Sequence, residues 1–376
     1  MSFKFIINRS FLFFWLTLSI YSLCLATDYS KIEDLLAPIT TSVKESIDPE
    51  TSPGIVFQAI WKDEVIYSHH YGLADIENGT PLTSSTAIRL ASLSKAFTAM
   101  AVMILADEKK LSVDSPVHTI IPELRHFKDI TIRHLLNHTS GIPDYYNSDL
   151  ILNDNYDMKC KMRNQDLVAL YQNWGELKFT PGSRFQYSNP GYEVLALIIE
   201  RIAEKKYGDF LNCRIFEPLG MMNSVVRENP DVLVEHSALG YRKSNDKKQQ
   251  WIVNDEHWAN GILGAGGIYA SLDDLRKWTK AIRNRSLISE EMSMQAFASV
   301  ELSDGSTSSY GFGWVLSKIK GHHAIHHTGS WVGFRTAIAI FPDNDLEIIV
   351  LSNSSTANPA MLRNTIAEFL LKELID

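Results

Sequence analysis

The chain has 376 residues, 45% of them hydrophobic and 21% charged, a composition typical of a globular protein of one or two domains with enough chain for a large core. Lys and Arg number 36 against 44 Asp and Glu, so the formal net charge is −8. This acidic balance argues against a polyanion-binding role, and therefore against nucleic acid as a partner.

The amino-terminal segment has the pattern of a secretory signal peptide. Lys4 and Arg9 precede the apolar run 11–26, which ends in a small residue. We therefore expect cleavage after Ala26 and a mature chain 27–376 that is exported to the periplasm or secreted, without stable membrane insertion. An uncleaved membrane anchor is the second alternative, because the apolar run is barely too short to span a bilayer.

The next stretch predicts one helix and two strands. Apolar residues recur on one face over roughly 29–47, which indicates an amphipathic helix. Two β-rich runs, Gly54–Trp61 and Glu64–Tyr71, are joined by Lys62-Asp63 and predict a hairpin.

Ser92 and Lys95 open a strongly helical segment that continues to about Lys110. Residues three apart on the first turn of a helix share a face, with Cβ atoms ~5–6 Å apart, so the lysine amine can reach the serine hydroxyl. A partly buried lysine with a lowered pKa can remove the serine proton, and the helix N-terminus favours negative charge there. Ser-x-x-Lys alone is usually a capping serine and a solvated lysine, so its weight depends on partners elsewhere.

In the region 111–254 short helices alternate with long loops. His134 and His138 have the i,i+4 spacing of a zinc pair, but no Glu lies between them and no third ligand pattern follows, which favours packing and loop-fixing roles. Tyr187 and Asn189 lead into a helix. For these two, a loop aromatic and a helix-start residue are the alternatives to a catalytic role.

The carboxyl-terminal part is again rich in β signals. Gly264–Gly267 is a tight backbone passage without a phosphate-loop lysine, Asp273–Ile282 predicts a helix, and Pro359–Leu374 predicts a closing helix. Four strands are predicted at Tyr310–Ser317, His322–Thr328, Phe334–Phe341 and Leu346–Ser352.

The simplest assembly of these elements is an α/β (α+β) fold. It has an antiparallel β-sheet flanked by the N- and C-terminal helices, plus an inserted all-α domain. Residues 27–90 and 260–376 would form the α/β subdomain, and residues 91–259 the helical one.

Cysteine is rare. Cys160 and Cys213 could pair in an exported protein, although their isolation suits two buried thiols about as well. Cys24 lies within the apolar run, so lipidation at Cys24 is the third alternative for the amino terminus. It is the least favoured one, because the bulky Leu23 precedes Cys24.

The 12 histidines are scattered without ligand spacing, so we expect no metal and no cofactor.

Three motifs in chain order carry a family resemblance: Ser92-x-x-Lys95, Tyr187-Ser188-Asn189 and His327-Thr328-Gly329. Together they resemble the serine β-lactamase and penicillin-binding-protein superfamily (β-lactamase/transpeptidase-like). The branch they are most similar to holds class C β-lactamases, D-alanyl-D-alanine carboxypeptidases and related esterases. Further similar stretches are Leu135–Gly141, Phe216–Met221 and Gly264–Gly267.

The resemblance implies roles for five residues. Ser92 would be the acylated nucleophile, Lys95 its general base, and Tyr187 the group that relays protons to the leaving group. Asn189 would bind the substrate amide or hold Lys95. The backbone N–H groups of Ser92 and Ser330 would form the oxyanion hole.

The strand from His327 would bind substrate through Thr328 and Gly329, because the absence of a side chain at Gly329 lets a substrate approach. His327 departs from the pattern, since β-lactamases of this branch usually carry lysine there and an imidazole is largely neutral near pH 7. This departure puts efficient β-lactam hydrolysis in question. The ring could bind a substrate carboxylate as an imidazolium or merely pack beside His326, and Arg335 could supply the missing charge.

The resulting expectation is a secreted serine hydrolase that forms an acyl-enzyme on Ser92. It would be a D,D-carboxypeptidase/peptidase-like or esterase-like enzyme acting on a small-molecule or peptide substrate, namely a D-amino-acid peptide, ester or amide. A true class C-like β-lactamase and a non-catalytic or acylation-only penicillin-binding protein are the alternatives. The substrate itself is left open, because fold does not fix function.

Overall fold

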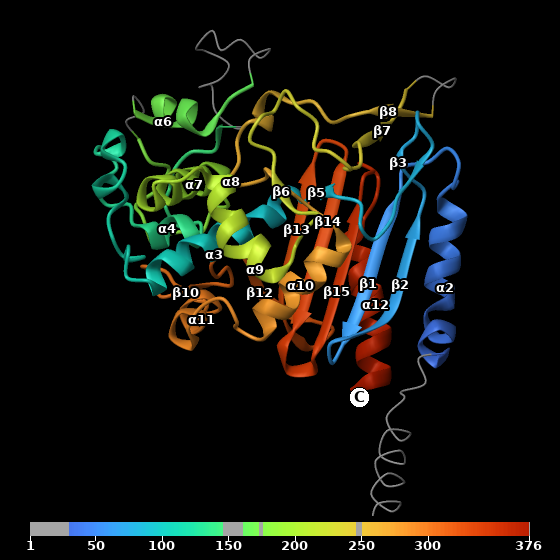
Figure 1. The fold of residues 1–376 in the computed structure, drawn as a ribbon. Coiled ribbons are helices and arrows are strands. Elements are labelled where there is room, and N and C mark those ends of the chain that lie inside the picture. Colours follow the sequence, from blue (N-terminus) through green and yellow to red (C-terminus); the bar gives the residue numbers. More distant parts are fainter. Residues whose placement is uncertain (1–29, 146–160, 173–175, 246–249, 376) are drawn as a thin grey trace, which may run out of the picture.

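The computed structural model describes residues 30–145, 161–172, 176–245 and 250–375. Its centre is a six-stranded antiparallel sheet in the order β12-β13-β14-β15-β1-β2 (Figure 1). The strands are β1 (Ile55–Trp61), β2 (Glu64–Tyr71), β12 (Val315–Ile319), β13 (His322–Trp331), β14 (Phe334–Phe341) and β15 (Leu346–Ser352). The predicted hairpin and the four carboxyl-terminal strands therefore form one open sheet, in which the pairing of β1 with β15 joins the two groups.

Each face of the sheet packs on its own hydrophobic cluster. On one face lie the two terminal helices, α2 (Ser30–Ser46) and α12 (Pro359–Leu374), as predicted. On the other face α10 (Leu272–Arg283) covers β15 and β1, and the helical half of the molecule continues the same cluster (Figure 1). The predicted antiparallel sheet with flanking helices is confirmed.

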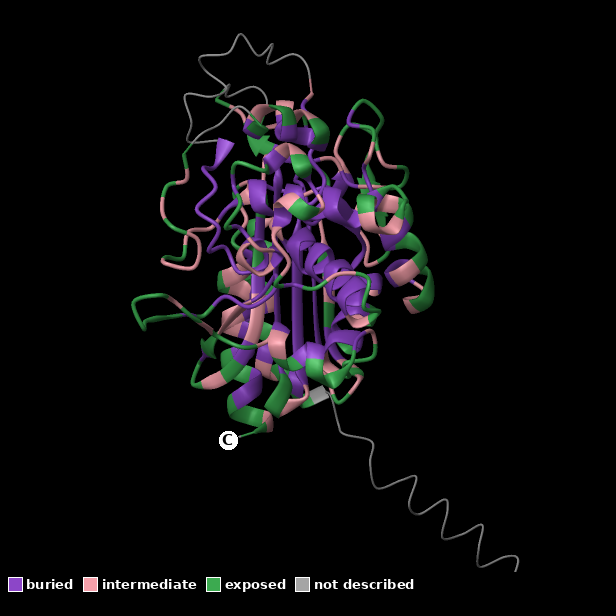
Figure 2. Ribbon diagram, turned by 90° about the vertical axis from the view of Figure 1, so that its left-hand side faces the viewer, coloured by how far each residue is buried: buried purple, intermediate pink, exposed green. Residues whose placement is uncertain are grey.

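The helical half is built around α3 (Ser94–Asp107), which is buried from Ser94 to Ala106 (Figure 2). A helix that is apolar on all sides can only be stable in a protein interior, and this sequence has no polar stripe to expose. Around it lie α4 (Ile132–Leu136), α6 (Asn164–Gln172), α7 (Asn189–Ala203), α8 (Tyr207–Leu211), α9 (Glu217–Leu219) and α11 (Glu290–Ala296).

The region 91–259 is not all-α, which corrects the prediction. It contributes β6 (Val225–Val226), which pairs with β9 (Ile268–Ala270), and the hairpin of β7 (Tyr241–Lys243) and β8 (Trp251–Val253). β9 also pairs with β5 (Ile88–Arg89), directly before Ser92. Strands of two or three residues are too short to show an alternating hydrophobic pattern, so periodicity could not predict them.

The strand before β13 also begins later than predicted: Tyr310 only bridges to Val315, where β12 begins, and β13 extends to Trp331.

Two smaller expectations can be compared with the described residues. Cys213 is exposed and has no disulfide partner among the described residues, so the buried-thiol alternative is wrong for Cys213. Cys160 lies outside the described residues. The predicted signal segment also lies outside them. No helix in the described ranges combines the length and the apolar character needed to cross a membrane.

Candidate active site

Ser92 and Lys95 meet at the start of α3. Ser92 lies in the 3₁₀ turn Ala91–Leu93, and Lys95 is the second residue of the helix. The Lys95 Nζ atom is 3.4 Å from the Ser92 Oγ atom, so the two side chains share a face as predicted. Ser92 lines a cavity of about 290 Å³, which makes it accessible to a substrate, whereas Lys95 is fully buried.

Two fixed acceptors hold the Lys95 amine. Its Nζ donates to Asn189 Oδ1 at 2.8 Å and to the carbonyl oxygen of Ala265 at 3.1 Å. Burial lowers the pKa of Lys95 well below its ordinary value, and the carboxylates of Glu193 and Asp144 oppose that shift. An amine with a lowered pKa and a fixed direction is suited to accept the proton of Ser92.

The turn that presents Ser92 is strained and tightly packed. Ala91 has a φ of +51°, in the left-handed region that L-residues other than glycine seldom adopt, at a cost of ~1–3 kcal/mol. Strand β13 packs on this turn at Gly329, where an added Cβ would lie 2.2 Å from the carbonyl oxygen of Leu90. Thr336 Oγ1 donates to the same oxygen at 2.9 Å. The lack of a side chain at Gly329 therefore makes room for the turn that carries Ser92.

Tyr187 lies beside the pair, with its ring 4.8 Å from Lys95 Nζ. Its phenol oxygen is buried and faces the Ser92 hydroxyl. Burial raises the pKa of Tyr187 above its ordinary value, and the Ser92 hydroxyl opposes the shift only in part. The phenol is therefore neutral and lies next to Ser92 and Lys95.

The loop before α7 is held by His138 and Asp144. The His138 Nδ1 atom accepts the backbone N–H of Ser188 at 3.2 Å, and the backbone N–H of Gln186 donates to the His138 carbonyl at 2.9 Å. Asp144 Oδ2 accepts both the backbone and the side-chain N–H of Asn189, each at 3.2 Å. The loop-fixing role predicted for His138 is confirmed, and of the two roles open for Asn189 the structure shows the one that holds Lys95.

His134 has the other predicted structural role. Its Nδ1 atom accepts the backbone N–H of Thr131, and Thr131 Oγ1 accepts that of His134, so the pair caps α4. Within the described ranges no group of three His, Cys, Asp or Glu side chains could hold a metal ion.

The residues of the predicted substrate strand alternate between its two faces. Thr328 and Ser330 are exposed, and Ser330 lines the cavity with Ser92. His327 and Gly329 point into the protein. Because side chains alternate along a strand, the four predicted binding residues cannot all face one substrate.

His327 is a buried neutral ring. Its Nδ1 atom lies 2.7 Å from the Thr328 carbonyl oxygen and its Nε2 atom 2.9 Å from the Tyr310 hydroxyl, so both nitrogens are engaged. Burial lowers the pKa of His327 to about 3, with a further contribution from the positive charge of Lys95. Of the two alternatives for His327, these contacts favour a neutral, packed ring over an imidazolium that binds a carboxylate. Arg335 donates to the carbonyl oxygens of Val332 and Phe334 and does not line the cavity.

Sequence reasoning missed Arg89, Asp144 and Glu193. Arg89 and Glu193 line the catalytic cavity, and Glu193 is 1% exposed on an otherwise apolar helix face. The available signal was the position of Glu193 four residues after Asn189, which places both side chains on one face of α7.

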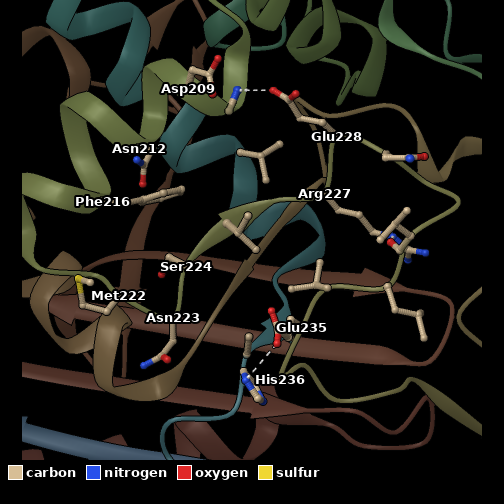
Figure 3. Close-up of a pocket in the computed structure, with 18 residues that line it drawn as sticks. Asp209, Asn212, Phe216, Met222, Asn223, Ser224, Arg227, Glu228, Glu235 and His236 are labelled. Atoms are coloured by element: carbon tan, nitrogen blue, oxygen red, sulfur yellow. Dashed lines mark hydrogen bonds and ion pairs between the residues drawn. The ribbon is translucent and has the colours of Figure 1, made fainter.

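A larger cavity, of about 680 Å³, lies away from these residues, beside α8 and β6 (Figure 3). Its buried Arg227 donates to the carbonyl oxygens of Val232 and Pro230, and Glu228 accepts the backbone N–H of Gly208. These polar groups are satisfied by the protein itself. The smaller cavity brings Ser92 together with Asn189 and Glu193.

The family described as Beta-lactamase matches residues 42–372, a range that includes every residue of this site. The chain belongs to the beta-lactamase family. Among curated relatives it is 35% identical over 303 residues to penicillin-binding protein 4* of Bacillus subtilis (strain 168), covering 77% of this chain and 66% of the relative. It is 25% identical over 300 residues to a D-aminopeptidase of Gluconobacter oxydans (strain 621H), covering 80% and 55%.

Solved structures of the beta-lactamase family and its relatives share the fold. The octameric penicillin-binding protein homologue from Pyrococcus abyssi aligns with a TM-score of 0.76 and 28% identity, over 91% of this chain and 77% of that one. A penicillin-binding protein from Bacillus halodurans aligns with a TM-score of 0.71 and 25% identity, over 87% and 97%. The chain thus spans about two thirds or less of the length of these curated relatives. It spans nearly the whole length of the Bacillus halodurans structure.

Proposed function

We propose that this member of the beta-lactamase family is a serine hydrolase that forms an acyl-enzyme on Ser92. The observation that carries the proposal is the buried Lys95 amine, which is held by Asn189 and Ala265 and lies beside a serine hydroxyl at a cavity. A merely structural lysine would be expected to reach solvent or to contact a carboxylate directly, and in the described residues this amine does neither, because no carboxylate oxygen lies within 4.0 Å of it.

The reaction follows from the geometry. Lys95 takes the proton of Ser92 as the Oγ atom attacks the substrate carbonyl carbon, and a tetrahedral intermediate forms. When the C–N or C–O bond to the leaving group breaks, the leaving group receives a proton through Tyr187. Water then attacks the ester on Ser92, gives up its proton through the same groups and releases the acid, which restores the Ser92 hydroxyl.

The oxyanion is assigned to two backbone N–H groups. Ser92 lies in the middle of the turn at the cavity, and Ser330 lies on the strand that packs against this turn. Removing one such donor typically costs ~2.7–4 kcal/mol of transition-state stabilisation.

The proposed substrates are D-amino-acid peptides, amides or esters. A relative named D-aminopeptidase supports this class. The neutral, buried His327 supports it as well, because the strand then offers no cation at the position where lysine would bind the carboxylate of a β-lactam. No observation specifically favours a class C-like β-lactamase or an acylation-only protein.

We further propose that the protein is exported after cleavage following Ala26. The basic start and the apolar run 11–26 support this. Mass spectrometry of the exported protein should find Thr27 at the amino terminus, and a retained Met1 or a lipid on Cys24 would contradict it.

Labelling with a fluorophosphonate probe tests the function. We expect a single labelled residue, Ser92, and loss of both labelling and hydrolysis of D-alanyl peptides and p-nitrophenyl esters in Ser92→Ala. Lys95→Ala should lose activity by a similar factor, because residues that act as a unit are not additive.

The exposed Ser85, which is outside the cavity, provides the control: Ser85→Ala should label and turn over normally. Labelling that persists in Ser92→Ala would overturn the assignment. A chromogenic cephalosporin hydrolysed as fast as the esters would favour the β-lactamase alternative.

A further inference from the structure

Glu193 is a buried carboxylate next to the proposed catalytic pair. It lies on the second turn of α7 among buried residues and is 1% exposed. An isolated carboxylate in such a place is costly unless hydrogen bonds and charge compensate it, so its presence requires a physical reason.

The Glu193 carboxylate binds the backbone of the glycine-rich passage. Oε2 accepts the N–H of Gly264 at 2.7 Å, and Oε1 accepts the N–H of Ala265 at 3.0 Å. Gly264 lies so close to α7 that an added Cβ would be 2.1 Å from the carbonyl oxygen of Tyr192. The passage is also tied to α3, because Thr98 Oγ1 donates to the Gly264 carbonyl oxygen at 2.6 Å.

The same passage directs the catalytic amine. The carbonyl oxygen of Ala265 accepts from Lys95 Nζ at 3.1 Å, so Ala265 binds Glu193 through its N–H and Lys95 through its C=O. In the described residues no ion pair within 4.0 Å joins the Glu193 carboxylate and the Lys95 amine directly. The carboxylate therefore acts on Lys95 through Ala265 and through the electrostatic field.

We propose that Glu193 is a positioning residue of the proposed hydrolase, which fixes Ala265 against Lys95 and serves as the buried counter-charge of the Lys95 ammonium. The inference rests on the proposed function of Ser92 and Lys95. The N–H groups of Gly264 and Ala265 require two acceptor oxygens. A glutamine at position 193 has only one side-chain oxygen, so its NH₂ group would face one of these N–H donors.

The negative charge of Glu193 raises the pKa of Lys95. Burial lowers the pKa of Lys95 and raises the pKa of Glu193, and each group opposes the shift of the other. The other titratable groups that face this pair are Asp144, His138, Tyr187, Tyr192, Tyr207 and His327. Without the carboxylate the ammonium form loses its main favourable interaction, so Lys95 should lose its proton at a lower pH.

The test is the rate of Ser92 labelling by a fluorophosphonate as a function of pH, with kcat and KM for a p-nitrophenyl ester measured in parallel. In Glu193→Gln we expect the acid limb of both profiles to move down by ~1 pH unit, as for the loss of a nearby opposite charge. We expect kcat to fall ~10-fold or more with little change in KM, because Lys95 is held less well. Glu193→Asp, which keeps the charge, should keep the acid limb of the wild type while kcat falls.

Glu200 is a matched control on the same helix. Its Oε1 atom accepts the backbone N–H of Tyr207 at 3.0 Å, so it also binds backbone, but it does not line the catalytic cavity. Glu200→Gln should leave the acid limb unchanged. Superimposable limbs in wild type and Glu193→Gln would overturn the inference, whatever the change in stability. If Glu193→Gln does not fold, Glu193→Asp provides the test. This variant keeps the negative charge, so an acid limb that moves down by ~1 pH unit in Glu193→Asp would contradict the proposal. A wild type that is not labelled on Ser92 at any pH would instead defeat the proposed function.

Discussion

At the scale of single residues, burial rather than residue type decides what the polar groups of this site can do. Lysine usually carries a charge, yet the buried Lys95 amine has a lowered pKa and can act as a base. Histidine is the usual pH-sensitive residue, yet both nitrogens of the buried His327 are engaged and it stays neutral. Sequence motifs single out these residues, but they do not reveal the protonation state that burial imposes.

Buried histidines should make the protein acid-sensitive. Burial lowers the pKa of His327 to about 3 and of His326 to about 4, so between their ordinary value and these values the unfolded state binds more protons. The free energy of unfolding should therefore fall as the pH drops from about 6.5 toward 4, by at most ~1.4 kcal/mol per pH unit for each histidine.

Urea unfolding at a series of pH values checks this. His327→Gln, which cannot be protonated and can still hydrogen bond, should show a shallower loss of stability than the wild type. The exposed His70→Gln is the control and should keep the wild-type slope. Equal slopes in all three proteins would show that His327 titrates normally.

At the scale of elements, the contact between β13 and the turn that carries Ser92 positions the nucleophile. Thr336 and Gly329 bring the strand onto the carbonyl of Leu90. Gly329→Ala would insert a methyl group 2.2 Å from that oxygen, and the backbone would have to separate. We expect a loss of stability of ~1–3 kcal/mol and a much larger loss of Ser92 acylation rate, because Ser330 moves with the strand.

Gly191→Ala on α7 is the comparison, since its nearest contact would be an ordinary 3.6 Å. Thermal unfolding and labelling rates measured on both variants separate the two effects. If Gly329→Ala acylates at the wild-type rate, the contact is not what positions the turn.

The fold was predicted well from elements with a long hydrophobic pattern. The closing helix Pro359–Leu374 and the hairpin strands occur where the periodicity places them, give or take a residue. The two- and three-residue strands and the contact at Gly329 were not predictable, because they depend on which distant segment lies opposite. Glu193 was missed for the same reason: its partners are backbone groups more than 70 positions later in the chain.

At the scale of the whole molecule, a charged cluster joins α10 to the end of the sheet. Arg283, which is largely buried, binds Glu347 and Asp345 at 2.8 Å each and also pairs with Asp63 in the β1–β2 turn. Glu347 is 1% exposed.

Removing Arg283 would leave the buried Glu347 without its cation. Arg283→Met should lower the free energy of unfolding by ~3–5 kcal/mol, as expected when one partner of a buried ion pair is removed. The double variant Arg283→Met with Glu347→Gln should recover part of this loss. Denaturant unfolding checks both, and a single-variant loss below ~1 kcal/mol would show that the cluster acts as a surface ion pair.

The strand order of the sheet has a consequence for protein synthesis. Strand β1 leaves the ribosome long before its partner β15, because nearly all the other described elements lie between them in the chain. A nascent chain therefore carries an unpaired, largely apolar β1 edge until β15 has been synthesised. Ribosome-bound chains that end before Leu346 should bind chaperones and resist labelling on Ser92, and release of the full chain should end both conditions.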